Sequence, residues 1–173
     1  MKKMRIAGFI VAGLLMAGSQ LVLASGRNTD VAPVDNPLYA KECSRCHFAY
    51  QPGLLPERSW RKLMESLNDH FGENIELLDA DRQALTDYIV KNSAERANYK
   101  RSAQMFHSIA KSDTPLRITK VFYFIKEHRE VANKARGNDK IKSLSQCEQC
   151  HQKAIDGSYV GSEINVPGLG RWD

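Results

Sequence analysis

The sequence has few residues that form crosslinks or bind metal ions, and it lacks the pattern that forms long strands. Only four cysteines, five histidines and two tryptophans occur among its 173 residues. Apolar and polar residues alternate over only a few positions at a time, and runs of β-branched residues are short. Because apolar residues recur instead at helical spacing, we predict an all-α fold.

All four cysteines belong to one pattern, Cys-x-x-Cys-His, which occurs twice. Its members are Cys43, Cys46 and His47, and then Cys147, Cys150 and His151. Two thiols three positions apart can each form a thioether to a haem vinyl group, while the adjacent imidazole reaches the iron from the same side. The motifs predict two covalently bound haem c groups, attached by the cysteines and ligated by the histidines. They leave no cysteine for a disulfide.

A zinc site and a redox-active dithiol are the alternatives for such motifs. The two halves of a structural zinc site are usually separated by roughly 12 to 20 residues, whereas Cys46 and Cys147 lie 101 positions apart. Zinc would also leave the histidine after each pair unexplained. A thioredoxin-like pair follows a buried strand, and no apolar β-branched run precedes either motif. Haem attachment is therefore the favoured interpretation.

The first residues have the pattern of a cleavable export signal. Lys2, Lys3 and Arg5 form a positive segment, residues 6–23 are apolar, and a small-residue cleavage site follows. We predict a signal peptide at residues 1–24 and a periplasmic mature protein. The alternative is an uncleaved anchor, because the apolar stretch is near the length that spans a bilayer. The cleavage site favours removal, so no stable membrane anchor is expected after processing.

The mature chain, residues 25–173, is long enough for one compact unit but not for two ordinary domains. We predict a first haem lobe at residues 25–95, resembling cytochrome c, and a second haem lobe at residues 96–173. The two lobes are expected to pack together as one small dihaem c-type cytochrome. Haem would supply part of the core.

The chain offers few ligands for the second face of each iron. Outside the motifs there are three histidines, His70, His107 and His128, and the mature chain has two methionines, Met64 and Met105. His70 lies near an apolar stripe in a helix predicted over residues 56–72. An imidazole aimed at an apolar interior needs a polar partner, and an iron would supply one.

His128 continues another apolar face, in a helix expected to begin near Thr114. Phe122 and Ile125 belong to the same predicted inward face. His107 instead lies in a basic, polar segment with a weaker stripe, so we expect it to face solvent or form hydrogen bonds. It is the first substitute if a predicted distal ligand is wrong.

The spacing of the histidines favours local pairing. His70 follows His47 by 23 residues, and His128 precedes His151 by 23. Because a short loop closes more easily than a long one, His47 with His70 and His128 with His151 are the expected ligand pairs. Crossed pairing is the open alternative.

Positive charge is concentrated in the middle of the chain. Residues 91–142 carry 13 basic and 5 acidic residues, a net charge of +8, whereas residues 25–90 have a net charge of −4. Such a run is commonly a solvated helix face. The alternative is a patch that steers a redox partner or neutralises haem propionates. Nucleic acid is not expected as a partner, because the chain is exported and lacks a basic groove with interleaved aromatic residues.

The sequence resembles the bacterial dihaem cytochrome c family, called DHC. The matching segments are the two haem motifs and residues 50–56 (YQPGLLP), 59–72, 115–119 (PLRIT), 127–128 and 167–168. The resemblance covers residues 37–168, and His107 lies outside the pattern. It implies a periplasmic dihaem electron carrier with both irons held by two histidines. It also implies redox partners, namely an oxygen-binding mono-haem cytochrome, the sphaeroides haem protein, and in some cases a membrane cytochrome b.

Two imidazoles on each iron would leave no open position for a substrate, so we predict an electron carrier rather than an enzyme. Two alternatives remain open. One is a dihaem peroxidase or small reductase with one open iron. The other is a docking subunit of a membrane oxidoreductase, tethered by an uncleaved signal.

Overall fold

The computed structural model describes residues 29–172, so the predicted signal peptide at residues 1–24 lies outside the described part. The α-helices are α1 (Pro37–Cys43), α2 (Glu57–Glu65), α3 (Asp79–Lys91), α4 (Lys100–His107), α5 (Phe122–Lys134) and α6 (Cys147–Cys150). The 3-10 turns are η1 (Pro52–Leu54), η2 (Leu67–Asp69), η3 (Ile118–Lys120), η4 (Ala154–Asp156) and η5 (Gly161–Glu163). The strands β1 (Asn165–Val166) and β2 (Gly170–Arg171) form a short antiparallel hairpin. The predicted helical architecture is confirmed.

The first half of the molecule is built from α1, α2 and α3. Large apolar side chains pack between α2 and α3, among them Trp60 and Leu63 of α2 and Leu85 and Ile89 of α3, all nearly inaccessible to solvent. Burial of each such side chain contributes about 1.5–3 kcal/mol. The Trp60 indole also donates to the Pro52 carbonyl oxygen at 2.7 Å. This helix pair forms a packed support for the first haem motif.

The helix predicted over residues 56–72 is shorter in the structure, where α2 ends at Glu65. The Ser66 hydroxyl donates to the Lys62 carbonyl oxygen at 2.9 Å. A side-chain bond of this kind competes with the helical hydrogen bonds and favours a helix end. The η2 turn follows, and His70 lies directly after it. His70 is therefore held by a turn rather than by a regular helix.

The helix expected to begin near Thr114 begins later, at Phe122. Val121, the residue before it, is extended and almost fully buried, and Phe124 is buried as well. The burial of Val121 and Phe124 determines how α5 is rotated about its own axis. Phe122 and Ile125 therefore point outward, with 66% and 49% of their surfaces exposed. The prediction that they face the interior is wrong.

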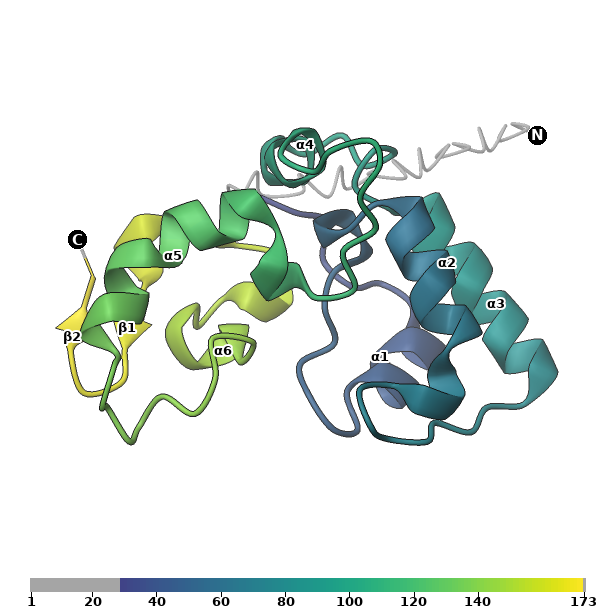
Figure 1. The fold of residues 1–173 in the computed structure, drawn as a ribbon, viewed down its shortest axis with the longest axis horizontal. Coiled ribbons are helices and arrows are strands. Elements are labelled where there is room, and N and C mark those ends of the chain that lie inside the picture. Colours follow the sequence, from purple (N-terminus) through teal and green to yellow (C-terminus); the bar gives the residue numbers. More distant parts are fainter. Residues whose placement is uncertain (1–28, 173) are drawn as a thin grey trace, which may run out of the picture.

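The two halves lie side by side. Figure 1 shows α1, α2 and α3 at one end, α5, α6 and the hairpin at the other, and α4 above the junction. The start of the described chain reaches the second half, where the amides of Asp30 and Val31 donate to the Gly157 carbonyl oxygen at 2.9 and 3.1 Å. The lobe boundary near residue 95 stays a prediction. Among the described residues, no helix has the length and apolar character needed to cross a bilayer.

Gln51 joins the two halves at their centre. Its side chain is fully buried. The amide nitrogen donates to the Ala154 carbonyl oxygen at 2.5 Å, and the amide oxygen accepts from the Tyr159 hydroxyl at 2.7 Å. Both bonds join residues more than a hundred positions apart in the sequence, so they constrain the tertiary fold rather than a local turn.

Replacing Gln51 with Leu should lower the free energy of unfolding by about 3 kcal/mol, because it leaves two buried polar groups without partners. Chemical denaturation followed by circular dichroism measures this change. Gln83→Leu, on the exposed side of α3, is the matched control and should change stability by less than about 0.5 kcal/mol. Wild-type stability in Gln51→Leu would contradict the central role of this contact.

Candidate haem sites

His47 and His70 face each other in the first half. His47 closes the first motif just beyond α1, and His70 follows η2. Their ring centroids are 6.2 Å apart, and the ring planes differ by 24°. A metal–imidazole bond is about 2 Å long, so two rings on opposite sides of one metal ion have centroids roughly 6 Å apart. The observed spacing fits one iron between these rings.

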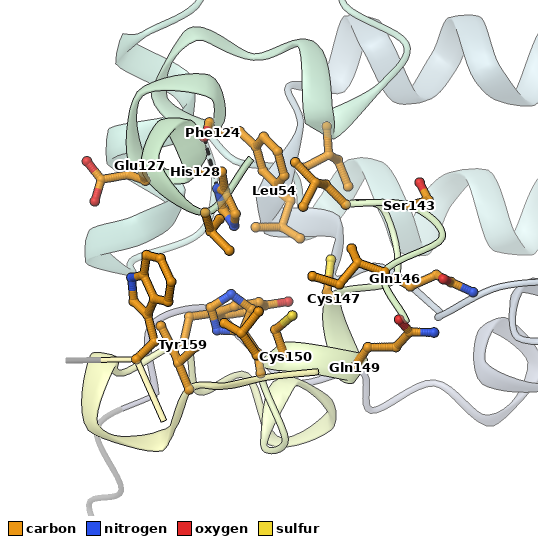
Figure 2. Close-up of a pocket in the computed structure, with 18 of the residues that line it drawn as sticks. Leu54, Phe124, Glu127, His128, Ser143, Gln146, Cys147, Gln149, Cys150 and Tyr159 are labelled. Carbon is orange, nitrogen blue, oxygen red and sulfur yellow. Dashed lines mark hydrogen bonds between the residues drawn. The ribbon is translucent and has the colours of Figure 1, made fainter. Parts of the chain in front are cut away.

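The second pair joins α5 to the second motif. His128 projects from α5, and His151 directly follows α6. The ring centroids are 6.0 Å apart, and the planes differ by 68°. In Figure 2, His128 points into a cavity from one side, and the sulfur atoms of Cys147 and Cys150 lie on the side of the second motif. This pair has the same metal-sized spacing as the first.

The cavity at the second pair has a volume of about 260 Å³. Large apolar side chains from both halves contribute to its walls, including Leu54, Met105, Phe124, Leu144, Ile164 and Trp172. A mostly apolar pocket with a few convergent polar groups is typical of cofactor sites. The cavity therefore suits a flat, largely apolar macrocycle with a metal at its centre.

Neither histidine pair is a complete metal site made of protein ligands. In the part of the chain that the structure describes, no three His, Cys, Asp or Glu side chains are grouped to hold a metal ion. A structural zinc ion needs four protein ligands, whereas a haem iron takes four nitrogens from the porphyrin and only its axial ligands from the protein. The paired histidines fit haem and argue against zinc.

The state of the cysteines also argues against redox-active dithiols. Burial raises the pKa of Cys43 and of Cys147 to about 12. Dithiols of that class depend on a low-pKa thiolate in an exposed, electropositive setting. At such a pKa both thiols, Cys147 buried and Cys43 half-buried, are protonated at neutral pH before haem is attached.

Backbone carbonyl groups orient one histidine of each pair. Nδ1 of His47 lies 2.7 Å from the Phe48 carbonyl oxygen, and Nδ1 of His128 lies 2.9 Å from that of Phe124. A ring that donates from Nδ1 keeps Nε2 free for a metal. The Phe124 ring also stacks on His128, with centroids 3.8 Å apart. These contacts restrict the rotation of both imidazoles.

Partial burial favours the neutral form of three of the facing histidines, His70, His128 and His151. It is the main cause of the lowered pKa of His70, of His128 and of His151, the last to about 4. Neutral imidazole is the form that ligates a metal. Within residues 29–172, Nδ1 of His70 and Nδ1 of His151 are buried without a hydrogen-bond partner. Metal coordination through the other ring nitrogen, Nε2, would offset part of the cost of burying these imidazoles.

Arg101 of α4 places a positive charge beside the second pair. It lines the same cavity, and its guanidinium lies 3.4 Å from the Asp30 carboxylate. It also lies 5.6 Å from the centroid of the Tyr159 ring and 6.0 Å from that of Tyr123. The sequence showed Arg101 only as one member of a basic run. Its position depends on how α4 packs across the junction, for which the sequence has no local pattern.

The remaining candidate ligands lie outside the facing pairs. His107 is exposed at the end of α4, which confirms its predicted orientation. Met64 is buried in the first half, and Met105 is buried beside the second cavity. In both halves the ring opposite the motif histidine belongs to the predicted distal histidine, so the structure brings together the locally paired residues.

A mostly helical chain with two haem attachment motifs, each facing a second histidine, defines a dihaem c-type cytochrome. Comparison with known families agrees, because a model of the dihaem cytochrome c family, DHC, matches residues 39–159. The chain belongs to this family, whose members carry two covalently bound haem c groups. Among curated proteins, none matches significantly.

Solved structures of dihaem cytochromes c are similar over most of the chain. The cytochrome from Shewanella baltica OS155 is 33% identical, with a TM-score of 0.66 over 80% of this chain and 98% of its own. A dihaem cytochrome c from Rhodobacter sphaeroides is 36% identical, with a TM-score of 0.63 over 75% of this chain and 100% of its own. These matches confirm the predicted fold class.

Replacing both Cys147 and Cys150 with Ser should remove one covalently attached haem and leave the other. The reason is that each haem needs the thiols of its own motif. Mass spectrometry of the intact, denatured protein counts the attached groups. The Cys43→Ser and Cys46→Ser double variant should lose the other haem, and retention of both haems in either variant would refute the assignment of these cysteines.

Proposed function

We propose that this chain is an exported, periplasmic electron carrier in which each iron has two histidine ligands, His47 with His70 and His128 with His151. The observation that carries this proposal is the facing of the rings within each pair, at 6.2 and 6.0 Å. With both axial positions filled, neither iron has an open position for a substrate. A haem held in this way would supply the electron-transfer chemistry, while the protein sets the potential and the access of partners.

The groups around the pairs would act on the reduction potentials in opposite directions. The bonds from Nδ1 of His47 and His128 to backbone carbonyl groups make these imidazoles better donors and so favour ferric iron. The absence of an axial methionine also favours a low potential. Arg101, beside the second pair, favours the ferrous state because its positive charge attracts the added electron.

Removing a distal ligand should open one iron to external ligands. In the reduced form of His70→Ala, and of His128→Ala, we expect one haem to bind carbon monoxide. Neither haem of the reduced wild type should bind it. Optical spectra of the reduced protein record this binding. His107→Ala, which alters the exposed histidine of α4, is the matched control and should behave as wild type.

Carbon monoxide binding by the wild type would contradict ligation by two histidines. It would favour instead a peroxidase-like or reductase-like enzyme with one open iron.

Arg101→Gln should lower the reduction potential of the second haem by tens of millivolts, because it removes a positive charge beside the site. Spectroelectrochemical titration measures both potentials. Arg129→Gln on the exposed side of α5 should have a much smaller effect, because solvent and salt screen an exposed charge. An equal reduction potential of the second haem in Arg101→Gln and Arg129→Gln would show that Arg101 has no special influence on that haem.

We also propose that α5 presents the docking face for an acidic redox partner. Phe122, Ile125, Lys126 and Arg129 recur at helical spacing and are exposed together. The apolar side chains offer contact area, and the positive charges attract an acidic surface. The same helix carries His128 on its inner side, so a partner bound there would lie close to the second haem. The proposed partners are an oxygen-binding mono-haem cytochrome and a membrane cytochrome b.

A further inference from the structure

Tyr50 lies between the two candidate haem sites and reaches both. Its ring stacks on the ring of His47, with centroids 4.9 Å apart and planes that differ by 27°. Its hydroxyl donates to the Ser145 carbonyl oxygen at 2.8 Å, although 95 positions separate the two residues in the sequence. The same carbonyl oxygen is 3.6 Å from Sγ of Cys147, the first cysteine of the second motif.

The two motifs also border one cavity. Its volume is about 350 Å³, and its lining includes Ser44 and His47 of the first motif and Glu148 of the second. The attachment segments therefore lie close together in the folded chain. Tyr50 lies three positions after His47, the last residue of the first motif. Its side chain therefore has to cross only the short distance between the two attachment segments.

We propose that the side chain of Tyr50 is the route by which an electron passes between the two haems. This inference rests on the proposed electron-carrier function and adds a specific path to it. An electron crosses bonded and hydrogen-bonded atoms faster than an open gap, because each contact provides overlapping orbitals. In each event one ferrous iron becomes ferric and the other ferric iron becomes ferrous. Tyr50 keeps its proton and is not itself oxidised.

The backbone around Tyr50 is held independently of its side chain. The Tyr39 hydroxyl donates to the Tyr50 carbonyl oxygen at 2.6 Å. The neighbouring Gln51 is bonded to Ala154 and Tyr159. A change confined to the Tyr50 ring or hydroxyl therefore leaves the segment anchored, which allows the electronic role to be separated from a structural one.

Two variants of Tyr50 test the two contacts of the proposed path separately. Tyr50→Phe removes the hydrogen bond to Ser145 and keeps the ring, while Tyr50→Leu removes the ring contact with His47 as well. Pulse radiolysis of the holoprotein, reduced by less than one electron per molecule, measures the rate of exchange between the haems. The rate should fall severalfold in Tyr50→Phe and by more than an order of magnitude in Tyr50→Leu.

Tyr88→Phe is the matched control. It also loses one hydrogen bond, in which the Asp35 amide donates to the Tyr88 hydroxyl at 3.3 Å, but that bond lies within the first half. Its exchange rate should equal that of the wild type. Reduction potentials and low-spin spectra should be unchanged in all three variants, because a path residue alters the rate without altering either end point.

Equal exchange rates in the wild type and both Tyr50 variants would overturn the proposal. A slower rate accompanied by a shifted potential or an altered low-spin spectrum would overturn it as well, because it would show a distorted haem site instead. Failure of the electron-carrier function itself has a different signature, since the wild type would then show no exchange between the haems.

Discussion

An iron held from two sides requires two imidazoles to face each other at a set distance, and the proposed function depends on this constraint. The chain meets it with four histidines in four different local settings. His47 follows α1, His70 follows a 3-10 turn, His128 lies within α5, and His151 follows α6. Three of them, His70, His128 and His151, are partly buried, and a neutral imidazole in an apolar setting is unfavourable without a partner. The packing of both halves is understandable if a metal supplies that partner.

The motifs could be predicted from sequence because attachment chemistry is local: two thiols and an imidazole fall within five positions. His70 and His128 could be predicted for a weaker reason, the apolar residues near them. That reasoning reached the residues that lie opposite the motif histidines, although part of the local structure it assumed was wrong. The helix before His70 ends at Glu65, and Phe122 points outward rather than inward. A stripe of apolar residues shows that a helix has a buried face. Which residues of α5 lie on that face is determined by tertiary packing, such as the burial of Val121.

The contacts between the halves could not be predicted in the same way. Gln51, Tyr50 and Arg101 all act across the junction, and their partners are far away in the sequence. Gln51 and Tyr50 belong to the segment YQPGLLP, whose residues 51–56 are all buried. The sequence showed this segment only as part of a family resemblance. The structure explains its composition, because it is the central connection between two sites that each need a fixed geometry.

Electron paramagnetic resonance of the fully oxidised wild-type protein tests the proposed ligation most directly. We predict two low-spin ferric signals. The pair His47 and His70, with planes 24° apart, should give the more rhombic signal, and His128 with His151, at 68°, the more anisotropic one. A high-spin ferric signal from either haem in the resting protein would contradict the proposal that two imidazoles hold each iron.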